Sequence, residues 1–269
     1  RPLARRKAAL TVEQRLFLRE LSRRTWVYFD KFVGPDDHWL PPDNYQEYRV
    51  AAIAHRTSPT NMGMALLANL SAYDFGYLQA GRLIERTAQT LRTMNGLERY
   101  RGHFFNWYDT QTLAPLPPLY ISTVDSGNLA GHLLTLRAGL LAMVDDKILR
   151  PQLFAGLSDT LELLASNVDE AMQDMVEALR RDLTAISIGP QETLAAARLV
   201  LARLATRADK LTSQVAGNFP AGDVSTPEEE VVEWARALAR QIHEALDELS
   251  FPGDEPTAID SIQSILELV

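Results

Sequence analysis

Residues 58–76 read SPTNMGMALLANLSAYDFG, and this stretch carries the signals of one complete α-helix. Ser58 stands at the N-cap position, Pro59 at the first helical position, and Gly76 where the pattern stops. A serine hydroxyl accepts a hydrogen bond from a first-turn N–H, and proline lacks an N–H that would have no partner there. The stretch therefore predicts a helix with both ends marked.

Similar patterns lie on both sides of this helix. Residues 11–33, TVEQRLFLRELSRRTWVYFDKFV, open with a capping box of Thr11 and Gln14. Further helical patterns cover residues 80–96 and 126–146. No run of alternating polarity is long enough to predict a sheet. We therefore predict an all-α chain.

The amino-acid composition of the chain changes near Lys147. Seventeen of the 21 aromatic residues precede it, and long, plain helical patterns follow at residues 158–183, 190–211 and 226–249. Gly, Pro and Asp predict a linker at residues 215–225. We expect two parts: residues 1–149 with ring-rich loops, and residues 150–269 as a helical packing, spacer or insertion segment.

Composition excludes several classes of function. A formal net charge of −8 argues against nucleic-acid binding, and the lack of cysteine excludes disulfides and thiolate metal sites. The spacing of the histidines does not suit a metal site, and the sequence has no phosphate-binding glycine loop. We therefore expect neither a metal nor a cofactor. No apolar run approaches the roughly 20 residues that span a bilayer. The chain starts with Arg1 and ends in a helical pattern at residues 258–269, so we expect an excerpt of a longer polypeptide.

Two long loops, at residues 34–61 and 98–127, carry the chemistry. Loops of this length are usually functional. Both mix aromatic rings with carboxylates, amides, Arg and His, which suits a sugar because its C–H faces stack on rings and its hydroxyls pair with polar groups. The candidate substrate-binding residues are Trp39, Asp43, Asn44, Gln46, Glu47, Arg56, Asn61, His103, Trp107, Tyr108, Asp109 and Asp125.

Some of these residues have a structural interpretation that stays open. The pattern STVD from Ser122 is a capping box, so Asp125 could serve only the helix start. Trp107 and Tyr108 are adjacent and face different ways, so we expect one to be buried and one available. Asp109 is harder to explain as a cap. Trp39 is either a stacking platform or a loop anchor.

Three segments also resemble a known family. Residues 24–47, 54–78 and 99–133 are similar to the central, glucoamylase-like region of bacterial cyclic β-1,2-glucan synthases, and the resemblance covers about residues 24–145. The motifs RTWVYFDKFVGPDDHWLPPDNYQE, AHRTSPTNMGMALLANLSAYDFGYL and RYRGHFFNWYDTQTLAPLPPLYISTVDSGNLAGHL carry it. Residues 150–269 resemble the less distinctive helical stretch that follows in those synthases.

The resemblance implies a fold and a setting. Those synthases are large bacterial inner-membrane enzymes in which a glycosyltransferase module extends linear β-1,2-glucan and a central (α/α)6 toroid cyclises it by retaining transglycosylation. A phosphorylase-like module then trims it. The chain would be the first half of the toroid with an additional long-helix segment. It would lie in the cytoplasm, with β-1,2-glucan and the rest of the same polypeptide as its partners.

The resemblance also implies which roles are missing. Retaining chemistry needs two carboxyl groups about 5–5.5 Å apart, and the family's SPWGISESAYN-type segment, where its catalytic glutamates lie, is absent from this sequence. We therefore expect glucan-binding subsites and no catalytic residue, with the chain alone inactive. The alternative is a non-catalytic helical module that holds glucan or docks domains. Uncovered apolar faces would favour self-association of the isolated chain.

Overall fold

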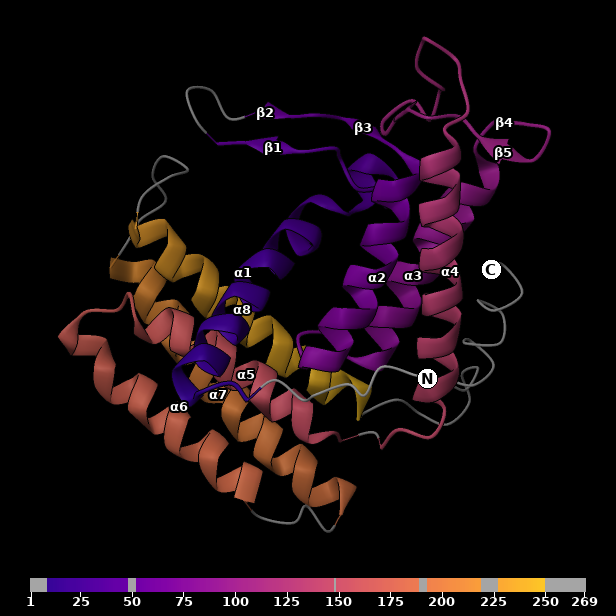
Figure 1. Cartoon of the computed structure of the whole chain (residues 1–269). Coiled ribbons are helices and arrows are strands. Elements are labelled where there is room, and N and C mark those ends of the chain that lie inside the picture. The colour runs from indigo at the N-terminus through magenta and orange to yellow at the C-terminus, as the bar shows by residue number, and fades with distance from the viewer. Residues whose placement is uncertain (1–8, 48–51, 148, 189–192, 219–226, 250–269) are drawn as a thin grey trace.

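The computed structural model describes residues 9–47, 52–147, 149–188, 193–218 and 227–249. Eight α-helices make up most of these residues (Figure 1), which confirms the predicted all-α class. They are α1 (Val12–Phe32), α2 (Pro59–Phe75), α3 (Ala80–Gly96), α4 (Thr123–Met143), α5 (Pro151–Ala165), α6 (Glu170–Ile188), α7 (Leu194–Asn218) and α8 (Pro227–Glu248). Most of the predicted linker and the helical pattern at residues 258–269 lie outside the described residues.

The predicted helix ends form as expected. The Thr11 hydroxyl accepts from the Gln14 N–H at 3.2 Å, while the Gln14 side chain accepts from the Thr11 N–H at 3.0 Å. Ser58 Oγ accepts from the Asn61 N–H at 3.2 Å. Gly76 ends α2 with φ 82°, and an added Cβ there would lie 1.9 Å from the Gln152 carbonyl oxygen, so only glycine fits.

The first core lies between α2, α3 and α4. Helix α2 packs against both α3 and α4, and its Met62 and Leu66 are fully enclosed together with Leu136 of α4. Two glycines allow the close approach: a Cβ on Gly63 would meet His132 of α4, and one on Gly139 would meet Leu70 of α2. These contacts fix how the first turns of α2 and α4 lie relative to each other.

The second core lies among α5, α6, α7 and α8, where Leu157, Leu161 and Leu238 are fully buried. Helix α1 lies between the two helical groups (Figure 1) and contacts both α2 and α5. Its buried Arg23 donates from Nε to Thr160 Oγ1 of α5 at 2.8 Å. The two cores flank the boundary predicted at residues 149 and 150, and the domain division stays a prediction.

Short antiparallel pairs order the loops. In the described residues β1 (Tyr45–Gln46) pairs with β2 (Ala52–Ile53), β4 (Arg99–Tyr100) with β5 (His103–Phe104), and β3 (Arg56–Thr57) with β6 (Tyr108–Asp109). A 3-10 turn, η1, spans Pro35–Asp37. Across β3 and β6, Arg56 stands opposite Asp109. Within the described ranges, no helix is both long and apolar enough to cross a bilayer.

Candidate functional site

The two long loops meet beside the N-terminal ends of α2 and α4. The β3–β6 pair joins them, and the Thr110 N–H donates to the His55 carbonyl at 3.1 Å. Ser58 and Ser122 then cap α2 and α4 directly after these loops. The two loops therefore converge, and polar side chains from both of them lie close together.

The first group in the site is built on Asp43. Arg56 donates to Asp43 Oδ2 from Nε at 3.2 Å and from Nη2 at 2.9 Å. Asn61 Nδ2 donates to the other oxygen, Oδ1, at 3.3 Å. The Arg56 guanidinium also lies 5.0 Å from the centre of the Trp107 ring. The pairing orients both charges, and it leaves the Arg56 side chain 52% exposed.

The second group is built on Asp125. Thr60 Oγ1 of α2 donates to Asp125 Oδ1 at 2.6 Å. The Asn106 amide, oriented by its partners, donates to Asp125 Oδ2 at 3.1 Å. The Asp125 N–H donates to Ser122 Oγ at 3.1 Å, so Ser122 is the helix cap. The Asp125 carboxylate therefore bridges the starts of two helices and a loop.

Electrostatics keep Asp125 ionised. Burial alone would raise the pKa of Asp125, but hydrogen bonds from the hydroxyls of Ser122 and Thr60 outweigh burial and lower this pKa. A carboxyl group that serves as a catalytic acid near neutral pH needs a raised pKa. The environment of Asp125 therefore suits an acceptor of hydrogen bonds better than a proton donor.

Asn106 joins the second group to the aromatic residues. Its side-chain oxygen accepts from Trp107 Nε1 at 2.6 Å and from the Tyr120 hydroxyl at 2.7 Å. The Asn106 N–H donates to the Tyr120 carbonyl at 2.9 Å. Asn106 is buried, whereas the Tyr120 side chain is exposed. Asn106, Thr60 and Tyr120 were not among the predicted site residues, although Asn106 precedes Trp107 in the motif NWY.

Trp107 and Tyr108 divide as expected into one available and one buried side chain. Trp107 is partly exposed beside Arg56. Tyr108 is fully buried; its hydroxyl accepts from the Phe105 N–H and donates to the Glu98 carbonyl, both at 2.7 Å. Burial raises the pKa of Tyr108. Tyr108 holds the loop in place and takes no part in the surface cluster.

Asp109 stabilises a turn of its own loop. Its Oδ1 accepts from the Thr112 N–H at 2.7 Å and from the Gln111 N–H at 2.9 Å. The Thr112 hydrogen bond is the main reason that the pKa of Asp109 is lowered. Capping of this kind is typical of Asp in turns, although the sequence alone had not suggested it for Asp109.

Of the other predicted site residues, Asn44 contacts the first group, and the rest lie outside both groups. Asn44 Nδ2 donates to Asp43 Oδ2 at 3.1 Å, and Gln46 is exposed on β1. His103 is exposed on the separate β4–β5 hairpin. Trp39 and Glu47 line a cavity between α1, α3 and α8.

His55 also has a structural role. Its Nδ1 lies 2.8 Å from Oδ1 of the buried Asp37, which also accepts from the Thr110 hydroxyl. Across the part of the chain that the structure describes, no group of three or more His, Cys, Asp or Glu side chains could hold a metal ion.

The fold and the site define a helical chain whose loops present rings, amides and fixed carboxylates beside helix starts. No family model matches the sequence. The chain is 40% identical over 184 residues to the cyclic beta-(1,2)-glucan synthase NdvB of Rhizobium meliloti (strain 1021). The resemblance predicted from the loop motifs is confirmed.

The similarity covers very different shares of the two proteins. The match covers 67% of this chain and 6% of the length of the Rhizobium meliloti protein. Among solved structures, a putative glucoamylase from Bacteroides fragilis NCTC 9343 aligns with a TM-score of 0.41 at 17% identity, covering 59% of this chain and 38% of that one.

Proposed function

We propose that the loop cluster around Asp43, Arg56, Trp107 and Asp125 binds β-1,2-linked glucan. The observation that carries this proposal is the pairing of two fixed carboxylates with a partly exposed ring on one surface. A carboxylate held by neighbours accepts hydrogen bonds from sugar hydroxyls without reorganising. An aromatic face stacks on the C–H face of the sugar.

The wider role follows from the similarity to the cyclic glucan synthase. In this proposal the chain forms the first half of an (α/α)6 toroid and supplies subsites to a domain that cyclises linear β-1,2-glucan by retaining transglycosylation. The rest of the same polypeptide, with its membrane glycosyltransferase module and phosphorylase-like module, would be its partner. The chain would lie on the cytoplasmic side of the bacterial inner membrane.

Neither Asp109 nor Asp125 is proposed as a catalytic acid. The acid of a retaining pair must hold a proton near neutral pH, and the pKa values of Asp109 and Asp125 are both lowered. These carboxylates fit sugar recognition. We therefore expect the chain alone to show no turnover of linear β-1,2-glucan.

A docking role is the second candidate, and the exposed side of α4 favours it. Val124 is 69% exposed and Leu134 is 71% exposed, although both are apolar. An uncovered apolar face of this kind commonly meets another protein surface. In this reading the chain would hold domains together or associate with itself without touching glucan.

Calorimetric titration of the 269-residue chain with a linear β-1,2-gluco-oligosaccharide tests the choice. Trp107→Leu should weaken binding by up to about tenfold, because one stacked ring contributes on the order of 0.5–1.5 kcal/mol. Tyr100→Leu is the matched control, since Tyr100 is 52% exposed on the separate β4–β5 hairpin. Equal affinity in both variants, or no binding by the unchanged chain, would reject the glucan site and leave docking.

A further inference from the structure

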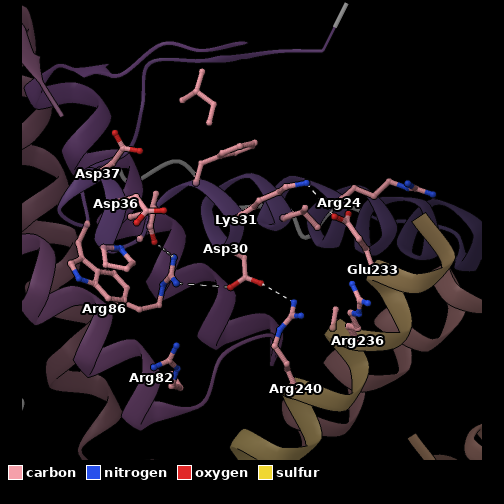
Figure 2. A pocket seen from close by; sticks show the side chains of 18 of the residues that line it. Arg24, Asp30, Lys31, Asp36, Asp37, Arg82, Arg86, Glu233, Arg236 and Arg240 are labelled. Carbon is pink, nitrogen blue, oxygen red and sulfur yellow. Dashed lines mark hydrogen bonds and ion pairs between the residues drawn. The ribbon is translucent and has the colours of Figure 1, made fainter. Parts of the chain in front are cut away.

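A second hollow lies apart from the loop site. It is a cavity of about 1120 Å³ between α1, the segment that contains η1, α3 and α8 (Figure 2). Pockets that hold drug-sized ligands measure about 300–1,000 Å³. The cavity is therefore large enough for an oligosaccharide. No residue of the Asp43 group or the Asp125 group of the loop site lines it.

The cavity has almost no net charge. Seven Lys or Arg side chains and seven Asp or Glu side chains line it. An anion site is normally dominated by cations, and a cation site by carboxylates. A balanced lining suits a neutral ligand whose groups both donate and accept hydrogen bonds, as sugar hydroxyls do.

Ion pairs between α1 and α8 hold much of this lining in place. Arg24 Nη1 lies 2.5 Å from Glu230 Oε1, and Lys31 Nζ lies 3.1 Å from Glu233 Oε1. Figure 2 shows the Lys31 and Glu233 side chains pointing toward one another. These pairs use up charge that would otherwise attract an ion, and they preset the shape of the wall.

Asp30 of α1 is shared in the same way. Its Oδ1 lies 3.9 Å from Arg86 Nη1 of α3, and its Oδ2 lies 3.7 Å from Arg240 Nη2 of α8 (Figure 2). Both separations are longer than a hydrogen-bond distance. A sugar hydroxyl could therefore donate to the Asp30 carboxylate while the ion pairs remain. Asp30 therefore offers an acceptor in the middle of the cavity.

Other lining groups have no partner among the residues that the structure describes. The side chains of Asp36, Glu47 and Arg236 make no hydrogen bond or ion pair with any described residue. At the base, Arg23 is 2% exposed and its Nη1 has no hydrogen-bond partner among the described groups. Burial lowers the pKa of Arg23 to about 10.

Aromatic surface completes the lining. Trp39 and Phe32 line the cavity, and both are partly exposed. A pyranose presents its C–H face to rings of this kind and its hydroxyls to the surrounding polar groups. The cavity thus repeats the chemistry of the loop site with different residues.

We propose that the cavity between α1, α3 and α8 is a second binding site for a neutral oligosaccharide. Trp39 and Phe32 supply ring surface, Asp30, Asp36 and Glu47 accept from hydroxyls, and Arg236 donates to them. The choice of β-1,2-linked glucose as probe rests on the proposed function, but the cavity itself shares no ligand-binding group with the loop site.

The experiment titrates the unchanged 269-residue chain and three variants with a linear β-1,2-gluco-oligosaccharide. Asp36→Asn with Arg236→Gln removes two unpaired charges from the cavity, and Trp107→Leu removes the ring of the loop site. Asp174→Asn with Arg198→Gln is the matched control, since both residues are exposed on α6 and α7 and neither lines the cavity. Circular dichroism checks that each variant is folded.

We expect two binding events in the unchanged chain. The cavity variant should weaken one about tenfold, Trp107→Leu should weaken the other, and the control should change neither. Loss of binding only in Trp107→Leu overturns the cavity site and keeps the proposed function. Loss only in the cavity variant keeps the cavity site and overturns the loop site. Binding of inorganic phosphate in place of the oligosaccharide, weakened by Arg236→Gln, would make the cavity an anion site and overturn the inference.

Discussion

The Thr60 hydroxyl on α2 donates a 2.6 Å hydrogen bond to the Asp125 carboxylate on α4. This bond links the first turns of two helices whose interiors are brought together by Gly63 and Gly139. Asn128 of α4 donates back to Thr60 Oγ1 at 3.1 Å. The site thus lies where the α2–α4 pair begins, and its carboxylate is positioned by the core beneath it.

Asp125→Asn separates the charge of this residue from its shape. The variant amide oxygen can still accept from Thr60, but its NH2 group would face the NH2 group of Asn106. We expect a free energy of unfolding lower by about 1–3 kcal/mol, because a buried donor loses its acceptor. Urea denaturation measures this, and calorimetry should show weaker glucan binding.

A second variant controls for general effects of losing a carboxylate on α4. Asp145→Asn alters an exposed residue just beyond the end of α4 and should change neither the unfolding free energy nor glucan affinity. If Asp125→Asn changes neither the unfolding free energy nor glucan affinity, Asp125 serves only the start of α4 and does not bind glucan.

The lowered pKa of Asp125 predicts how stability depends on pH. A carboxyl whose folded-state pKa lies below its unfolded value of about 3.9 stabilises the protein above that value. This stabilisation is lost as the pH falls through the lowered folded-state pKa. Between pH 7 and about pH 5 we therefore expect no change from this group, and a progressive loss below about pH 4.

Denaturation curves of the unchanged chain and Asp125→Asn, recorded at several pH values, measure this dependence. The stability difference between the two should shrink as the pH falls below about 4, since the charge no longer distinguishes them. Asp109, whose pKa is also lowered, remains in both proteins and cancels from the comparison. A difference that stays constant down to pH 2 would show that the Asp125 charge does not stabilise the fold.

Local signals made the helices predictable. Thr11 with Gln14, Ser58 and Gly76 act through neighbours within a few residues, so their roles could be predicted from the sequence. The role of Asn106 could not, because it depends on Tyr120 and Asp125 meeting in space. The β3–β6 pair also left no pattern, since strands of two residues are too short to show alternation.

The role of some residues could not be predicted because their residue type suits both sugar binding and a structural role. Asp109 belongs to a ring-rich motif, yet its carboxylate closes the turn through the N–H groups of Gln111 and Thr112. Tyr108 is of a residue type that commonly binds sugars, but its side chain lies in the core. Composition identifies the loops that carry the chemistry, whereas packing decides which of their side chains remain accessible.

Gly63→Ala tests the packing that positions α2 against α4. An added Cβ would lie 2.3 Å from His132 Nδ1, so the two helices must separate or the imidazole must move. We expect a loss of about 1–3 kcal/mol in the free energy of unfolding. Thermal and urea denaturation measure it.

Gly131→Ala is the matched control on α4. An added Cβ at Gly131 meets nothing within 4 Å, and alanine favours a helix over glycine by up to about 1 kcal/mol. The control should therefore be neutral or more stable than the unchanged chain. If Gly63→Ala is stabilised as well, α2 and α4 do not pack as closely as their glycines indicate.

Trp107→Phe separates stacking from the hydrogen bond made by the same side chain. Phenylalanine keeps a ring beside Arg56 but removes the N–H that donates to Asn106 Oδ1 at 2.6 Å. Asn106 Oδ1 still accepts from the Tyr120 hydroxyl, so we expect stability to fall by only about 1 kcal/mol. Glucan affinity should fall less in Trp107→Phe than in Trp107→Leu, because an aromatic face remains for the sugar. Calorimetric titration of both variants gives the comparison. Equal losses of affinity would show that Trp107 acts by fixing Asn106 and the Asp125 carboxylate, and that its ring does not stack on glucan.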